Sequence, residues 1–197
     1  DYLSRASLLA QTMLQQFFDG QRGGFYLYAD DAEQLIVRTK ENYDGAMPSG
    51  NSTAAGVLQT LSEITGLTKW QEALEKQMSY LAGAMESYPS GHSYALLTIM
   101  NILHPAKELL CTIPADANPD NSNEVLKQLS YLSETVPNLT VIVKTTANAN
   151  ELKKLAPYTE NYPVTKSGIQ FYLCTANNCM PPVSNLDQLM KDLEVHI

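Results

Sequence analysis

The sequence has little of the charge and none of the basic clustering that several protein classes require. Only 17% of its 197 residues are charged, below the roughly 25% typical of soluble domains, and Lys and Arg total 13 against 21 Asp and Glu. A nucleic-acid-binding protein needs clustered Lys and Arg to displace counterions from phosphates, so we expect no nucleic-acid partner. Apolar residues make up an ordinary 44%, which is enough for a hydrophobic core and excludes a disordered acidic tail.

Long hydrophobic runs and targeting signals are also missing. No apolar run reaches the ~20 residues that cross a bilayer, and the N-terminus has no signal-peptide pattern. We therefore expect no membrane partner and a cytoplasmic, intracellular protein. The chain begins with Asp1 instead of Met, so we expect a processed chain or an excised piece of a longer one.

Cysteine and histidine are scarce and scattered. Three cysteines are too few for a disulfide scaffold. Cys174 and Cys179 have neither the two-residue spacing of a redox dithiol nor a second ligand pair for zinc. The loop between them is long enough to fold back, so a disulfide is geometrically allowed, while two reduced structural thiols are the interpretation we prefer. The sequence predicts no metal site and no cofactor.

The first half of the chain has the periodicity of helices. Apolar stripes at helical spacing predict helices over about 3–18, from Ser52 to Gly66, from Thr68 onward and around 94–102. Short loops between them predict a mainly α architecture of antiparallel helical hairpins. Two aromatic and β-branched runs, 25–28 and 34–38, flank an acidic turn and predict a small β-hairpin.

After Pro105 the pattern changes to that of a small α/β unit. Apolar runs predict strands at 108–113, 139–143 and 169–174. Helical patterns follow the first and third runs, which predicts a three-stranded α/β segment. We place a domain boundary near residue 104, giving domains 1–104 and 105–197.

The densest polar segment runs from Arg38 to Ser52 and precedes a predicted helix. Glu41 and Asp44 are candidates for a general acid and base if their surroundings separate their pKa values. Arg38 and Lys40 are candidates for orienting an anionic or hydroxylated ligand. The alternative is structural, because Asp-Gly and Pro-Ser-Gly-Asn-Ser also suit turns and helix caps, and Lys40 can simply pair with a carboxylate.

Three further residues complete the candidate binding set. Asn51 offers a donor and an acceptor beside the free amides of a predicted helix N-terminus, and Tyr43 is a candidate for positioning a hydroxylated ligand. His92 falls in the predicted first turn of a helix, where the dipole favours a neutral base. A lone histidine in such a turn is more often a structural hydrogen-bonding residue.

Several motifs along the chain form one recognisable set. They are Gly23-Gly24-Phe25-Tyr26, Val37-Arg38-Thr39-Lys40-Glu41, the segment from Tyr43 to Ser52, Phe171-Tyr172-Leu173-Cys174, Cys179 and Pro182-Val183. Together they resemble the C-terminal region of one family, the spermatogenesis-associated protein 20-like proteins and their bacterial thioredoxin-domain relatives, and the resemblance covers nearly the whole chain.

The resemblance implies a longer parent protein with a thioredoxin-like domain followed by an (α/α)6 toroid similar to six-hairpin glycosidases and epimerases. On that basis we expect residues 1–104 to be the last hairpins of the toroid. One hypothesis is that the parent acts on or binds a saccharide, with Glu41 and Asp44 as acid and base. The other is a non-catalytic scaffold or partner-binding domain of a redox protein, in contact with the parent's thioredoxin-like domain. An open half-toroid exposes apolar helix faces, so we also expect self-association of the isolated chain.

Overall fold

The chain folds into two compact units, residues 1–103 and 104–197. The computed structural model describes residues 2–33, 36–104, 106–166, 168–175 and 178–193. Each unit has its own hydrophobic core, and the two are described separately.

Unit 1 is helical. It contains the helices α1 (Tyr2–Phe17), α2 (Gly50–Thr65), α3 (Thr68–Met85), the 3-10 helix η1 (Pro89–His92) and α4 (Ser93–Leu103). α2 has a clear start and stop: the Ser49 hydroxyl accepts a hydrogen bond from the Ser52 N–H, and Gly66 ends the helix in the left-handed conformation. The core gathers around the fully buried side chains of Leu58 and Trp70.

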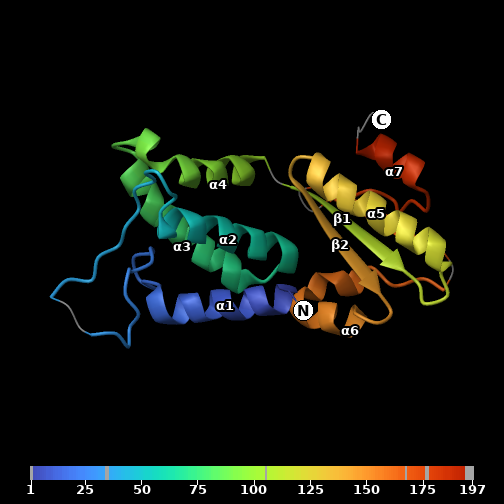
Figure 1. Ribbon diagram of the computed structural model, residues 1–197, viewed down its shortest axis with the longest axis horizontal. Helices are drawn as coiled ribbons and strands as arrows, with labels where there is room; N and C mark the ends of the chain where they lie inside the picture. Colours follow the sequence, from blue (N-terminus) through green and yellow to red (C-terminus); the bar gives the residue numbers. More distant parts are fainter. Residues whose placement is uncertain (1, 34–35, 105, 167, 176–177, 194–197) are drawn as a thin grey trace. The chain divides into compact units, whose positions relative to one another are not determined.

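The arrangement of these helices differs from the predicted toroid segment. α2 packs against both α3 and α4, and α2 and α3 run side by side in Figure 1. The 3-10 turn η1, which begins at Pro89, contacts α3 and α4 and redirects the chain so that α4 packs along α2. The prediction that residues 1–104 are hairpins forming part of an (α/α)6 toroid is therefore wrong: the helices of the described residues show no such ring, and α4 returns along α2. Apolar stripes identify helices, but they do not specify which helix packs on which.

The predicted β-hairpin at 25–38 is also wrong where the structure describes it. Residues 34 and 35 lie outside the described part, and the rest of the segment contains no strand, only an isolated bridge between Phe18 and Phe25. A backbone hydrogen bond from the Leu27 N–H to the carbonyl of Thr39, just after the segment, joins its two arms. Both backbone hydrogen-bonding groups of Phe25 are bound by the side chain of Asn51 instead, so a β ladder cannot use them.

Unit 2 is an α/β unit built on one sheet. Its elements are β1 (Lys107–Ile113), α5 (Pro119–Thr135), β2 (Leu139–Thr145), α6 (Ala149–Leu155), the 3-10 helix η2 (Pro157–Asn161), β3 (Gln170–Thr175), β4 (Asn178–Cys179) and α7 (Leu186–Asp192). The strand order is β2-β1-β3-β4. β1 and β2 are parallel, and β3 runs antiparallel to both β1 and β4.

The sheet therefore has four strands and mixed directions, and the prediction of three strands is wrong. The missing strand, β4, has only two residues, too few to show any periodicity in the sequence. It forms because Cys174 and Thr175 of β3 pair with Cys179 and Asn178.

Alternation along the strands divides unit 2 into layers. The side chains of Leu109, Cys111 and Ile113 pack with α5 and α7 in the main core. The intervening side chains of Leu110 and Ile142 point to the other face, beside η2. Figure 1 shows α5 and α7 above the strands and α6 below them.

None of the helices in the described ranges combines the length and the apolar character needed to cross a bilayer.

Candidate functional site

The polar segment 38–52 is fixed to the helical unit by its own side chains. It runs from the extended chain before α2 into the first turn of that helix. Most of the predicted binding residues lie in this segment, and Lys40, Asp44 and Asn51 form hydrogen bonds with other parts of unit 1.

Asn51 is the central clamp of the segment. Its side chain is buried, and its Oδ1 accepts hydrogen bonds from the Phe25 N–H (2.6 Å) and the Gln77 Nε2 (3.0 Å). Its Nδ2 donates to the carbonyl oxygens of Phe25 (3.0 Å) and Glu41 (2.6 Å). Gln77, buried on α3, also accepts from the Gly24 N–H. The two amides thus hold three separate stretches of chain together, with every hydrogen-bonding group of Asn51 engaged.

Asp44 is buried and ties two helices together. One carboxylate oxygen accepts a hydrogen bond from the Ser49 N–H (2.8 Å), and the other accepts from the Ser52 hydroxyl (3.1 Å). The second oxygen also accepts from the N–H groups of Tyr94 and Ala95 in the first turn of α4. Burial by itself would raise the pKa of Asp44, but these hydrogen bonds outweigh it and hold the pKa below its ordinary value. This carboxylate is a stable anion at the starts of α2 and α4.

Lys40 pairs with a carboxylate that the sequence analysis did not include. Its Nζ donates to Asp19 Oδ2 (2.8 Å) and to the Gly23 carbonyl (2.6 Å), and both charged side chains are largely buried. The hydrogen bond from Lys40 is the main reason that the pKa of Asp19 lies well below its usual range. Gly23 has a positive φ of +72°, and a Cβ there would lie 2.1 Å from the Lys76 carbonyl oxygen, so only glycine fits.

Arg38 is half-buried, and its guanidinium is bound within unit 1. Its guanidinium forms an ion pair with Asp30, donates to the Tyr28 carbonyl (2.9 Å) and stacks over the Tyr26 ring at 3.9 Å. Lys40 contacts the same ring at 4.6 Å. The two cations therefore brace a tyrosine and the loop that carries it.

Of the remaining predicted residues, Glu41 and Tyr43 are accessible and His92 is buried. Glu41 has an exposed side chain. Tyr43 is 53% exposed and lies nearly parallel to Tyr88, which is 54% exposed, with ring planes 7° apart and centroids at 6.3 Å. His92 ends η1 directly before α4, and its Nδ1 lies 2.7 Å from the Asn42 carbonyl oxygen. That carbonyl can only accept, so Nδ1 carries the proton. The roles of Glu41 and Asp44 as acid and base stay predictions.

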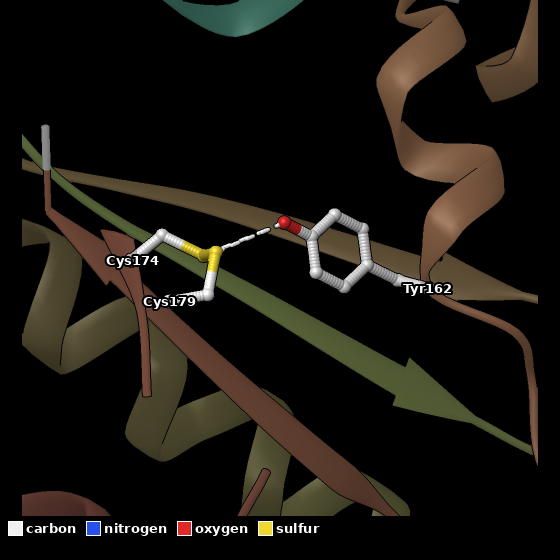
Figure 2. The surroundings of a disulfide bond; sticks show 3 residues. All are labelled: Tyr162, Cys174 and Cys179. Atoms are coloured by element: carbon white, nitrogen blue, oxygen red, sulfur yellow. Dashed lines mark hydrogen bonds between the residues drawn. A yellow bond between two sulfur atoms is a disulfide. The ribbon is translucent and has the colours of Figure 1, made fainter. Parts of the chain in front are cut away.

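In unit 2, Cys174 and Cys179 form a disulfide across the β3–β4 pair. The sequence allowed either a disulfide or two reduced thiols at these positions, and the structure contains the disulfide. Cys174 is buried and Cys179 is exposed. The Tyr162 hydroxyl lies 3.1 Å from the Cys179 sulfur and 3.5 Å from the Cys174 sulfur, and Figure 2 shows it directed at the bond. Cys111, the third cysteine, is free and buried, and burial raises its thiol pKa to about 12.

Tyr162 belongs to a small pocket on one face of the sheet. The pocket is lined by Glu108, Leu109, Leu110, Thr140, Ile142, Tyr158, Tyr162 and Cys174. The segment that carries Tyr162 is held to the sheet by Lys144, whose buried Nζ donates to the carbonyls of Thr159 (2.6 Å) and Tyr162 (2.8 Å). Burial lowers the pKa of Lys144.

A search of the described part of the chain finds no cluster of three or more His, Cys, Asp or Glu side chains arranged to hold a metal ion. Such a cluster is the minimum that a zinc site takes from the protein. The carboxylates of Asp19 and Asp44 are each bound by hydrogen-bond donors instead.

Three important residues were missing from the sequence-based candidates. The sequence could have indicated Gln77, because it is a polar residue between Leu74 and Leu81 on the apolar stripe of α3. A polar side chain in that position is buried and needs a hydrogen-bond partner. The indication for Lys144 was weaker: its position in the alternating pattern of β2 places it on the same side as Ile142. Tyr162 follows a 3-10 helix without periodicity, and nothing in the sequence indicates its position beside the cysteines.

Comparison with known proteins gives a distant relationship. No family model matches the chain. It is 24% identical over 193 residues to human spermatogenesis-associated protein 20, and 24% identical over 191 residues to the mouse protein of that name. Each alignment covers 96% of this chain and 24% of the relative, so the chain spans about a quarter of the length of the curated relatives it matches. Across most of its length, this chain is therefore a distant relative of part of spermatogenesis-associated protein 20.

Proposed function

We propose that this chain is a non-catalytic, partner-binding portion of a larger protein, and that α4 carries the binding surface. The observation that carries the proposal is how completely segment 38–52 is bound to its own unit. The side chains of Lys40, Asp44 and Asn51 form hydrogen bonds with backbone and side-chain groups of unit 1. A buried carboxylate that accepts four hydrogen bonds is a poor proton acceptor for a substrate.

The proposed binding surface is the outer side of α4. Leu97, Met100 and Leu103 follow one another at three-residue spacing, which gives them one side of a helix. They are 53%, 57% and 69% exposed, while Ala95 and Thr98 on the inner side are buried. Large apolar side chains gathered on one surface commonly mark a protein interaction site.

The occupant that we propose is another segment of the same longer polypeptide. The chain covers 24% of the human relative that it resembles, so that protein has a large additional part. An apolar helix face suits packing against a neighbouring helix of the same molecule, where the contact is permanent and need not be polar.

The test compares one pair of substitutions in two settings. Leu97→Gln with Met100→Gln should change the stability of the isolated chain little, because both side chains are already in water. In the longest natural polypeptide that contains this chain, the same pair should lower the melting temperature of unit 1 and increase hydrogen exchange in α4.

A matched control uses exposed apolar residues of unit 2. Leu126→Gln with Tyr131→Gln replaces side chains that are 41% and 54% exposed, and it should have a small effect in both settings. An equal effect of the α4 pair in the two settings would contradict the proposal. Loss of a concentration-dependent dimer of the isolated chain would assign α4 to self-association instead.

A saccharide site is the second candidate, and the exposed tyrosine pair favours it. The apolar face of a sugar ring packs on aromatic side chains, and Tyr43 and Tyr88 form a stacked pair of nearly parallel rings that are each about half exposed. The exposed carboxylate of Glu41 would accept hydrogen bonds from hydroxyl groups.

This candidate is tested by NMR titration of the chain with a panel of mono- and oligosaccharides. We expect saturable shifts that Tyr43→Ala abolishes and that Tyr28→Ala, a change of another exposed tyrosine, leaves intact. Binding that persists unchanged in Tyr43→Ala would remove this site. Binding that Glu41→Gln weakens would place Glu41 within it.

A further inference from the structure

We propose that Cys174 and Cys179 form a thiol–disulfide exchange site, which a dithiol reductant enters from the Cys179 side. The two residues are direct register partners on β3 and β4, at the edge of the sheet formed by the two-residue strand β4. Figure 2 shows the bond between these strands with the Tyr162 ring beside it.

The difference in exposure between the two cysteines sets the direction of attack. A thiolate attacks one sulfur of a disulfide and expels the other. Cys179 is exposed and Cys174 is buried, so an incoming thiolate reaches the Cys179 sulfur and Cys174 is the leaving group. A symmetric, fully buried disulfide would offer no such path.

Tyr162 is placed to donate a hydrogen bond to either sulfur. The sulfurs of a disulfide carry no proton, so the hydroxyl is the donor; it lies 3.1 Å from the Cys179 sulfur and 3.5 Å from the Cys174 sulfur, the leaving group. Burial, Glu108 and Tyr172 raise the pKa of Tyr162, which keeps the hydroxyl protonated. Glu108 is the register partner of Cys174 on β1 and its negative charge disfavours a thiolate there, so the hydroxyl donor is the group that favours departure of the Cys174 sulfur.

The chemistry balances with a dithiol as the co-reactant. The first thiolate of the dithiol bonds to the Cys179 sulfur, the bond between Cys179 and Cys174 breaks, and Cys174 leaves as a thiolate that takes up a proton from solvent. The second thiolate of the dithiol then attacks the dithiol sulfur that is bonded to Cys179. This step releases Cys179 as a thiolate, which also takes up a proton. Two electrons pass to the chain, and the dithiol becomes a disulfide.

The fold allows the bond to open without loss of the core. The core cluster of unit 2 is formed by α5, α7 and the opposite face of the sheet. The chain after β4 is held by a second pairing, in which Phe171 and Val183 exchange backbone hydrogen bonds of 2.8 and 3.0 Å. Reduction therefore removes the covalent link between β3 and β4 and changes the contact with Tyr162, while the helices stay packed.

The first experiment asks whether the native chain is reduced. The chain is treated with dithiothreitol, alkylated and analysed by mass spectrometry, while hydrogen exchange in α5 reports whether unit 2 stays folded. We expect two new alkylated cysteines, Cys174 and Cys179, with α5 protection unchanged, and re-formation of the bond on removal of dithiothreitol. Reduction that occurs only in denaturant would overturn the proposal and leave a static structural bond.

The second experiment tests the direction of attack. Cys174→Ser leaves the exposed Cys179 thiol, and Cys179→Ser leaves the buried one. We expect the Cys174→Ser chain to react with an aromatic disulfide reagent at least about tenfold faster. The third thiol, Cys111, is buried in both variants. Equal rates would contradict entry from the Cys179 side.

The third experiment tests the hydroxyl donor. Tyr162→Phe keeps the ring and removes the hydroxyl, and should slow reduction by dithiothreitol roughly five- to tenfold, the effect of one hydrogen bond to a developing charge. Tyr158→Phe removes a hydroxyl from the same pocket that contacts neither sulfur, and should leave the rate unchanged. The same slowing in both variants would assign the effect to packing and remove Tyr162 from the site.

Discussion

Each unit holds a loop to its core with one buried polar side chain, and the two clamps differ in charge. In unit 1 the neutral amide of Asn51 makes four hydrogen bonds and leaves no group unpaired. In unit 2 the ammonium of Lys144 donates to two carbonyls, and burial lowers its pKa. Burying a neutral side chain costs little free energy when all its polar groups are hydrogen-bonded. For a charged side chain, the free energy lost by removing the charge from water offsets part of the stabilisation from its hydrogen bonds. The amide clamp should therefore be the stronger of the two.

The largest effect is expected from Asn51→Ala. It leaves the Phe25 N–H and the carbonyls of Phe25 and Glu41 without their partner, and should cost about 4 kcal/mol of unfolding free energy. Denaturant unfolding followed by the fluorescence of Trp70, the single tryptophan, reports unit 1 alone. Asn42→Ala is the control, since its one side-chain bond is long at 3.4 Å, and it should cost less than about 1 kcal/mol. A similar cost for both would mean that the four bonds of Asn51 are not the source of the stability.

Asp44→Asn should cost about 2–3 kcal/mol at neutral pH, because the amide presents hydrogens where Asp44 accepts from N–H and O–H groups. The same change tests the pH dependence. The pKa of Asp44 is lower in the folded chain, so the unfolded state binds more protons and the stability falls as the pH drops below about 4. Asp44→Asn should flatten part of this acid-side slope, and Asp19 should keep the rest, since its pKa is also lowered. An unchanged slope would show that Asp44 is not ionised in the folded protein.

Lys144→Met should cost only about 1–2 kcal/mol, since the loss of two hydrogen bonds is offset by relief from burying a charge. Faster hydrogen exchange at 157–162 would locate the effect. A cost above that of Asn51→Ala would break the comparison between the two clamps.

Glu41→Gln should change the stability by less than about 0.5 kcal/mol, because the side chain is exposed. Thermal unfolding monitored through Trp70 measures it. A larger loss would reveal a charged contact at Glu41.

Helices and strands of this chain could be predicted from the sequence where apolar residues recur at the regular spacing of a helix or a strand. The helices of unit 1 and the strands β1, β2 and β3 coincide with runs of helical or strand pattern in the sequence. β4 was not readable, because two residues have no period. The 25–38 hairpin failed for a different reason: its residues suit a strand, but the Asn51 side chain takes the backbone groups that a ladder would need.

For segment 38–52 the structure answers the structural part of the prediction. The structural alternative for Lys40, pairing with a carboxylate, is what the structure contains, while the proposed catalytic and binding roles of the segment stay predictions. The identity of that carboxylate, Asp19, depends on a turn 21 residues away, and the four donors around Asp44 come from two different helices. Contacts of this kind depend on packing between distant parts of the chain, which residue types alone do not encode.

By itself, the sequence determined the composition of the two units, the positions of most elements and the residues available for chemistry. The tertiary structure decided what those residues do. It decided that Asp44 and Asn51 are bonded inside their unit, and that Tyr162 meets Cys174 and Cys179 across a gap in sequence. The physical reason is that local periodicity is a property of neighbouring residues, whereas burial, pKa and hydrogen-bond partners depend on which distant groups the fold brings together.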